Sequence, residues 1–278
     1  SGVGQAAVRA TASATADSQW VRINKAAQTI TFGALANKTF GDADFDLAAT
    51  ASSTLAVSYA SSDDTIASIA GATVTIHKAG TVTITASQAG DGNYSPAADA
   101  QQDLTIDKAD QTITFGALAG KTYGDADFDL AATADSTLAV SYASSDDTVA
   151  SIAGATVTIH KAGTVTITAS QAGNGNYNAA ADVPQVLNVA KVDLTVTANA
   201  GQSKAYGDPE PALFTYTITT GALVGGDTLT GALSRVAGED VANYAIQQND
   251  LAASANYTLT YVGANFAVTK ADQTITFG

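Results

Sequence analysis

The sequence contains no cysteine and no methionine in its 278 residues. A disulfide framework and thiol chemistry are therefore excluded, and stability must come from packing within each domain. No run of 18 apolar residues occurs, so the sequence predicts no transmembrane helix. The N-terminus has no basic region followed by an apolar one, so we expect an export signal, if the chain is secreted, to lie outside it.

Basic residues are scarce, because 12 lysines and arginines stand against 26 aspartates and glutamates, for a net charge of −14. Such a charge repels the phosphates of nucleic acids and of anionic lipids, so nucleic-acid binding and membrane insertion are not expected. Cations are the small partners that this charge favours.

A long internal repeat is the strongest feature present. Lys25 opens the stretch KAAQTITFGALANKTFGDADFDLAAT, and Lys108, 83 residues later, opens KADQTITFGALAGKTYGDADFDLAAT. Residues 25–107 and 108–190 differ at only 14 of 83 positions. This length suits one compact β-sandwich, which needs about 80 to 100 residues.

Two further lysines complete the domain organisation that the sequence predicts. Lys191 opens a stretch that soon diverges from the repeat, and Lys270 opens the sequence KADQTITFG. We expect, in order, the C-terminal strands of a preceding truncated repeat (1–24), a first repeat (25–107), a second repeat (108–190), a different β domain (191–269) and the first strand of a following repeat (270–278).

The apolar residues have the period of β-strands. In Thr81–Ala86, Val82 and Ile84 point to one face and the threonines to the other. Alternation of this kind among β-branched residues is typical of half-buried strands. Phe45–Thr54 is rich in alanine and could form a short helix, but it lacks helical spacing, so we expect strand and turn there.

Glycine and aspartate mark the turns between these strands. Turns are predicted at 61–64, 70–71 and 90–93, and His77–Gly80 is predicted to close a hairpin between its flanking strands. Many short strands with such turns predict an all-β fold of sandwich domains. Because only two or three residues join consecutive repeats, we expect tandem sandwiches in an elongated end-to-end rod.

Two family resemblances cover most of the chain. Residues 25–190 resemble the bacterial Ig-like tandem repeats of giant surface adhesins, through QTITFGAL, KTYGDADFDLAAT, LAVSYASSD and AGTVTITASQAGNGNY. Residues 191–269 resemble the MBG type of adhesin domain, although Ala242 stands where relatives carry glycine. The positions that match are Lys204–Pro209, Gly226–Gly231, Arg235, Gly238–Val241, Tyr244–Ile246, Asn256–Thr258 and Phe266–Lys270.

These resemblances imply a function as well as a fold. They imply immunoglobulin-like and MBG β-sandwiches in a secreted protein of the bacterial cell surface. They imply spacer domains without enzymatic activity, and they do not imply a known ligand for each repeat.

Acidic side chains recur at alternate positions in both repeats and are candidate calcium ligands. An EF-hand would need glycine and glutamate where Leu47 and Ser53 stand, so that motif is excluded. Calcium in another geometry, such as at a junction between domains, and a plain solvated turn are the two interpretations; no other cofactor is indicated. The candidates are Asp42, Asp44, Asp46, Asp125, Asp127 and Asp129.

The remaining candidates for chemistry favour structural interpretations, and we predict no catalytic residue. Asp63–Asp64 and Asp146–Asp147 could pair for acid–base work, but exposed turns explain them. His77 and His160 are the only histidines. One histidine per repeat cannot build a two-histidine metal site by itself, and a Ser-His-Asp triad would require both copies to be enzymes.

Two groups of residues in turns are predicted to anchor loops. Arg235 with Glu239 or Asp240 would form an ion pair within 191–269. Three tyrosines that directly follow an asparagine are predicted to be packing anchors whose hydroxyls reach the backbone. A platform that binds sugars is the alternative. The three tyrosines are Tyr94, Tyr177 and Tyr244.

Three roles stay open at the level of sequence. The first is a stalk that holds a distal adhesive domain away from the cell, with neighbouring repeats of the same protein as its partners. The second is a self-assembling extracellular filament or sheath, joined head to tail by strand complementation through 1–24 and 270–278. The third is a module that binds calcium or polysaccharide.

Overall fold

The computed structural model describes residues 5–7 and 20–276, and every regular element in these ranges is a β-strand. No helix in this part of the chain is long and apolar enough to cross a membrane. The chain forms two compact units, one of Ser1–Thr112 with Ala172–Ala180 and the other of Ile113–Gln171 with Ala181–Gly278. The predicted all-β fold is therefore confirmed.

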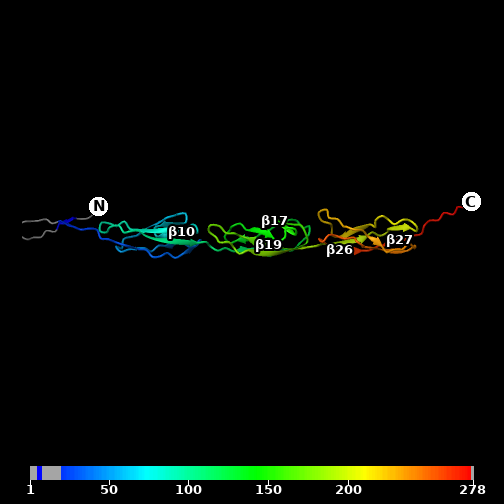
Figure 1. Cartoon of the computed structure of the whole chain (residues 1–278), viewed down its shortest axis with the longest axis horizontal. Helices are drawn as coiled ribbons and strands as arrows, with labels where there is room; N and C mark the ends of the chain where they lie inside the picture. The colour runs from blue at the N-terminus through cyan, green and yellow to red at the C-terminus, as the bar shows by residue number, and fades with distance from the viewer. Residues whose placement is uncertain (1–4, 8–19, 277–278) are drawn as a thin grey trace, which may run out of the picture. The chain divides into compact units, whose positions relative to one another are not determined.

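The first unit contains two larger sheets and two small ones, and the strand labelled β10 in Figure 1 belongs to the largest of them. A four-stranded sheet has the order β4 (Lys38–Thr39), β11 (Ala100–Asp107), β10 (Gly80–Ser87) and β7 (Ser58–Ser61). A three-stranded sheet has the order β5 (Phe45–Asp46), β9 (Thr73–Ile76) and β8 (Ala67–Ala70). The two-stranded sheets are β3 (Ile30–Thr31) with β6 (Thr50–Ala51) and β1 (Gln5–Ala7) with β2 (Trp20–Arg22).

The core of this unit follows from strand alternation. Val82 and Ile84 of β10 are buried, and they cluster with Leu104 of β11 and Val74 of β9. Since β10 and β9 belong to different sheets, the cluster lies between two sheets, which is the arrangement of a β-sandwich.

The second unit begins with the same arrangement, formed by the second repeat. Its four-stranded sheet is β13 (Lys121–Thr122), β20 (Val183–Ala190), β19 (Gly163–Ser170) and β16 (Ser141–Ser144). Its smaller sheets are β14 (Phe128–Asp129), β18 (Thr156–Ile159) and β17 (Ala150–Ala153), and the pair β12 (Ile113–Thr114) with β15 (Thr133–Ala134). Val165, Ile167 and Leu187 take the core positions of Val82, Ile84 and Leu104.

Residues 191–269 form a different sandwich in the second unit. One sheet is β23 (Tyr216–Thr220), β21 (Val192–Ala198) and β26 (Tyr257–Val262). The other is β22 (Ser203–Ala205), β27 (Asn265–Thr269), β25 (Asn243–Gln247) and β24 (Ser234–Arg235). Val196 of the first sheet and Phe266 of the second meet in one buried cluster. Here β21 pairs in parallel with β26 along a full strand, where the repeats have single parallel bridges, Ala26 with Tyr94 and Ala109 with Tyr177.

Strand and turn, predicted within residues 45–54, are confirmed by β5 and β6. The hairpin predicted around His77–Gly80 is wrong. β9 and β10 lie in different sheets, so the stretch between them crosses the sandwich. The amides of His77 and Lys78 both donate to the carbonyl of Ile66, at 2.9 and 3.2 Å. Gly80 has a φ of 154°, and a Cβ there would lie 3.2 Å from the side chain of Ile66. Alternation is the same on both sides of such a crossing, so the sequence pattern could not distinguish it from a hairpin.

Short pieces of the two end segments lie within the described residues. β1 and β2 pair antiparallel, with Gln5 opposite Arg22. Residues 270–276 follow β27 and form no strand. The rest of the predicted strands in 1–24 and 270–278, namely 1–4, 8–19 and 277–278, falls outside the described residues.

Candidate functional site

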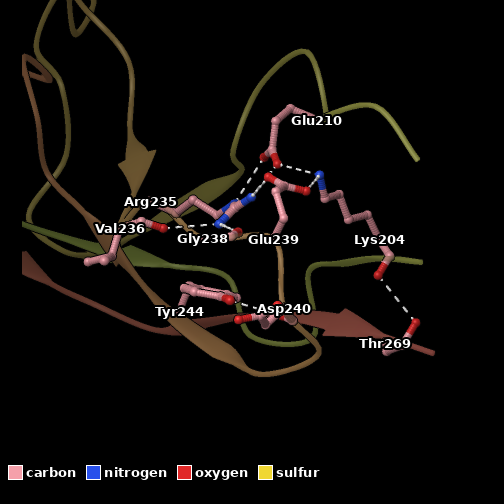
Figure 2. Close-up of polar contacts among 9 residues, drawn as sticks. All are labelled: Lys204, Glu210, Arg235, Val236, Gly238, Glu239, Asp240, Tyr244 and Thr269. Atoms are coloured by element: carbon pink, nitrogen blue, oxygen red, sulfur yellow. Dashed lines mark hydrogen bonds and ion pairs between the residues drawn. The ribbon is translucent and has the colours of Figure 1, made fainter. Parts of the chain in front are cut away.

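Four charged side chains lie together in residues 191–269, and we call them the Arg235 cluster: Lys204, Glu210, Arg235 and Glu239 (Figure 2). Lys204 Nζ lies 2.7 Å from Glu210 and 2.6 Å from Glu239. The guanidinium of Arg235 lies 2.9 Å from Glu239 and also contacts Glu210. Each cation thus contacts both carboxylates.

The guanidinium of Arg235 also contacts two aromatic rings and two backbone carbonyls of its own loop. It stacks over the rings of Tyr244 and Phe266, at 4.9 and 5.3 Å from their centroids. Its Nη1 donates to the carbonyls of Val236 and Gly238, at 3.0 and 2.6 Å. The side chain is only 6% exposed, which is possible because every face of it has a partner.

The electrostatics of the cluster keep all four groups charged. Hydrogen bonds from Arg235 and then Lys204 lower the pKa of Glu210 to about 2. The pKa of Glu239 is lowered mainly by Lys204, and the pKa of Lys204 is raised mainly by Glu210. Two cations and two anions balance one another, so the cluster holds the loop at 236–240 against the segment at 204–210.

The predicted ion pair of Arg235 with Glu239 is confirmed, while the alternative partner Asp240 takes another role. The backbone carbonyl of Asp240 accepts a hydrogen bond from the hydroxyl of Tyr244 at 2.9 Å, which confirms the predicted anchor at this tyrosine. Sequence reasoning missed Lys204 and Glu210 as partners. Both lie in or next to the Lys204–Pro209 motif. They are at least 25 residues from Arg235 along the chain, and no local sequence pattern links residues so far apart.

The structure gives each candidate calcium ligand of the first repeat its own hydrogen-bond donor. Asp42 accepts from the amide of Thr39 at 2.9 Å and so closes the turn on itself. Asp44 accepts from the hydroxyl of Thr75 at 2.9 Å, and Asp46 from that of Thr73 at 2.6 Å. Asp44, just before β5, and Asp46, within β5, are therefore paired with threonines of β9, whereas Asp42 stays within its own turn.

The second repeat has the same pairs. Asp125 accepts from the amide of Thr122 at 2.8 Å, and Asp127 and Asp129 accept from threonine hydroxyls of β18 at 2.9 and 2.6 Å. Within the described ranges no group of three or more His, Cys, Asp or Glu side chains is placed to hold a metal ion. Calcium at these aspartates stays a prediction.

The other sequence candidates lie on exposed turns and strand faces. Asp63 accepts from the amide and hydroxyl of Thr65, at 2.9 and 2.7 Å, and these hydrogen bonds lower its pKa; Asp146 does the same with Thr148. His77 Nε2 lies 2.7 Å from the hydroxyl of Ser68 on the neighbouring strand, in an exposed pair.

An aromatic contact that the sequence did not predict occurs inside each unit. The ring of Phe40 packs edge-on against that of Tyr177, with centroids 5.4 Å apart. In the second unit the ring of Tyr123 packs in the same way on Tyr257, at 5.8 Å. The prediction that Tyr177 is a packing anchor is therefore confirmed, with a ring rather than a backbone group as its partner.

A carboxylate joins the second of these contacts. The hydroxyls of Tyr123 and Tyr257 both donate to Asp227, at 3.1 and 2.7 Å. Burial, and then the hydrogen bond to this carboxylate, raise the pKa of both phenols. Gly124 lies beside them, and a Cβ there would come within 2.6 Å of the side chain of Val224. The second repeat and the 191–269 sandwich are thus closely fitted at this point.

Comparison with known families identifies one part of the chain. Residues 194–267 match the model of the MBG domain (YGX type), which bears out the resemblance of that segment. The Tyr-Gly-Asp sequence at 206–208 lies within the match. No curated protein sequence matches the chain.

Solved structures are similar only at a low level. Immunoglobulin domains 1–5 of Sidekick-1 match with 11% identity and a TM-score of 0.29, over 88% of this chain and 59% of that one. Drosophila N-cadherin EC1-3 matches with 10% identity and a TM-score of 0.34, over 84% and 98%. The human Desmocollin-1 ectodomain matches with 8% identity and a TM-score of 0.31, over 88% and 62%. The chain therefore spans less than two thirds of the Sidekick-1 and Desmocollin-1 chains.

Proposed function

We propose that this chain is a non-catalytic spacer of a large, secreted bacterial cell-surface adhesin. Its tandem β-sandwiches would hold an adhesive part of the protein away from the cell. The match of residues 194–267 to the MBG family supports the proposal, as does the resemblance of 25–190 to adhesin repeats.

The observation that carries the proposal is the very short linker between the second repeat and the 191–269 sandwich. β20 ends at Ala190 and β21 begins at Val192, so a single residue separates the last strand of one sandwich from the first strand of the next. A flexible tether would instead be a longer stretch rich in glycine and serine. The shared hydrogen bonds of Tyr123 and Tyr257 to Asp227 restrain the same junction.

The charged side chains support a structural role as well. In the Arg235 cluster each cation is bound by two carboxylates, and the aspartates of β5 and β14 are bound by threonines. These groups stabilise loops and strand pairs.

Sedimentation velocity and negative-stain microscopy over a wide range of concentrations test the proposal. A spacer is expected to remain monomeric. Continuous fibres that disappear when residues 270–278 are removed would overturn it in favour of a filament joined by strand complementation. A chain without residues 1–24 is the matched control for the other end.

A further inference from the structure

The same aromatic turn occurs at three places in the chain. In each, an aromatic residue follows a short strand, precedes a glycine and an aspartate, and donates its amide to the carbonyl of residue 107, 190 or 269, at 2.9, 2.9 and 2.8 Å. The glycines have φ values of 92°, 90° and 86°. The three aromatic residues are Phe40, Tyr123 and Tyr206.

Two of these rings are covered by a tyrosine that follows an asparagine. Phe40 packs on Tyr177 at an interplanar angle of 82°, and Tyr123 packs on Tyr257 at 87°. These edge-to-face contacts are a preferred geometry for aromatic pairs. In both cases the preceding asparagine side chain also accepts a hydrogen bond, at 3.0 Å, from a backbone amide, that of Ala79 or Ala162.

The opening residues of a repeat hold this Asn-Tyr loop in place. The amide of Ala109 donates to the carbonyl of Asn176, and the amide of Asn178 donates back to Ala109, both at 2.9 Å. The side chain of Gln111, 5% exposed, donates to the carbonyl of Asn178 at 2.6 Å. The first repeat has the same contacts at Ala26 and Gln28.

The third aromatic residue differs, because Tyr206 is 56% exposed. It lines a groove with Asp240, Val241 and residues 270–273, which we call the Tyr206 groove. Val241 is 51% exposed, so the groove presents apolar surface. The segment that forms one wall of it, residues 270–273, follows β27 directly and is drawn in red in Figure 1.

The residues of that wall have the same sequence as the first residues of the second repeat. Residues 270–278 are identical to residues 108–116. Ala271 and Gln273 therefore correspond to Ala109 and Gln111, yet Gln273 is exposed where Gln111 is buried. The groove thus contains both elements that receive an Asn-Tyr loop elsewhere in the chain, the aromatic turn and the opening segment.

We propose that the Tyr206 groove is the docking site for the Asn-Tyr loop of a further repeat that begins at Lys270. The tyrosine of that loop packs edge-on against Tyr206. Ala271 and Gln273 bind its backbone as Ala109 and Gln111 bind residues 176–178. The inference rests on the proposed function, since it names the partner of one end of the spacer.

A single-tryptophan chain tests the proposal. Trp20 is the only tryptophan, so Trp20→Phe combined with Tyr206→Trp gives a probe in the groove. A second form of this chain carries residues 117–190 directly after Gly278, which completes a copy of the second repeat. We expect the acrylamide quenching constant of the probe to fall several-fold in the extended chain, to the value of a Tyr123→Trp reference.

Two controls make the outcome decisive. Alanines at the appended asparagine and tyrosine that correspond to Asn176 and Tyr177 should restore quenching, and a probe made by Tyr216→Trp on β23 should not respond to the extension. An unchanged quenching constant at Tyr206→Trp, in an extended chain whose calorimetric unfolding enthalpy has increased, overturns the proposal. The spacer function would survive that result, because it is tested by the absence of fibres.

Discussion

Arg235 shows how much one side chain can stabilise in a small β-sandwich. It contacts two carboxylates, two backbone carbonyls and two aromatic rings while only 6% exposed. A paired charge of this kind adds little over an apolar side chain, but loss of one partner leaves the others desolvated and unpaired. The planar guanidinium is needed because a lysine ammonium cannot serve these directions at once.

We expect Arg235→Lys to lower the free energy of unfolding of this sandwich by about 2 kcal/mol, through lost carbonyl hydrogen bonds and ring stacking. Hydrogen exchange at the amides of β25 and β27 measures the loss. Arg22→Lys, at an exposed arginine, is the matched control and should change stability by less than about 0.5 kcal/mol. Equal protection in the two variants would contradict the role assigned to Arg235.

The lowered pKa of Glu210 predicts a dependence of stability on acid. Because this carboxylate binds its proton less tightly in the folded chain, its contribution is fully present above pH 4.5 and is lost as pH falls toward about 2. Its side chain is 43% exposed, so we expect a loss of only about 1 kcal/mol. Hydrogen exchange or urea unfolding between pH 2 and pH 6 measures it.

Glu210→Gln should flatten that pH profile in the 191–269 sandwich. The variant should be less stable than the parent at pH 6 and nearly equal to it at pH 2. Asp272→Asn, at an exposed carboxylate outside the cluster, is the control for removing a charge elsewhere in the chain. A profile that keeps its full slope in Glu210→Gln would show that another group carries it.

In the two repeats, the loop that ends on an Asn-Tyr pair has a shape that depends on one glycine, Gly90 or Gly173. Gly173 has a φ of 75°, and a Cβ there would lie 2.4 Å from the carbonyl oxygen of Tyr177. Gly175 in the same loop has no atom within 4 Å of such a Cβ. The loop therefore offers a matched pair of glycines.

We expect Gly173→Ala to destabilise the first unit by about 2 kcal/mol, since it adds both backbone strain and a steric clash, and Gly175→Ala to cost less than about 0.5 kcal/mol. Thermal unfolding of the two variants measures the difference. Similar melting temperatures would show that the loop relaxes around the new methyl group.

The paired strands β5 and β9 bear on the calcium hypothesis. Asp44 and Asp46 each bind a threonine hydroxyl of β9, so we expect a chelator to leave the melting temperature unchanged. A bound ion would raise the melting temperature by mass action, so a decrease on chelation, abolished in Asp44→Asn with Asp46→Asn, would establish calcium instead. Thr75→Val tests the hydrogen-bond interpretation directly, because it should destabilise β5–β9 pairing with or without calcium.

Across the whole molecule, the predicted repeats and the compact units divide the chain differently. Among the residues that the structure describes, three buried clusters form, one in each of 25–107, 108–190 and 191–269, whereas the chain divides into two compact units. Each cluster belongs to its own pair of sheets, which favours three sandwiches that unfold separately.

Pulling the chain from its ends in a force microscope tests that expectation. We expect three unfolding events, each adding roughly 25 to 30 nm of contour length, because an extended residue spans about 3.5 Å. Two larger events would mean that the compact units, rather than the repeats, are the cooperative domains. Tyr123→Ala should leave the number of events unchanged, since Tyr123 is only a partly buried neighbour of the second repeat's cluster and the buried residues of all three clusters are kept.

Much of the fold could be predicted from sequence because it depends on local patterns. Alternation places Val82 and Ile84 on one face wherever their strand lies, and the 83-residue repeat carries that assignment to Val165 and Ile167. The candidate site was less predictable. The ion pair of Arg235 with Glu239 spans one turn of loop, but Glu210 is 25 residues away along the chain.

The sequence by itself determined that this protein is made of β-strands, where its repeats begin, and which residues of some repeat strands, such as Val82 and Ile84, share a buried face. These are properties of short segments, set by backbone geometry and by the burial of apolar side chains. Only the tertiary structure decided that β9 and β10 join different sheets, that Lys204 and Glu210 complete the Arg235 cluster, and that Phe40 and Tyr123 meet tyrosines more than 130 residues away. Those outcomes depend on which distant segments come together when apolar faces pack, and no local pattern encodes that choice.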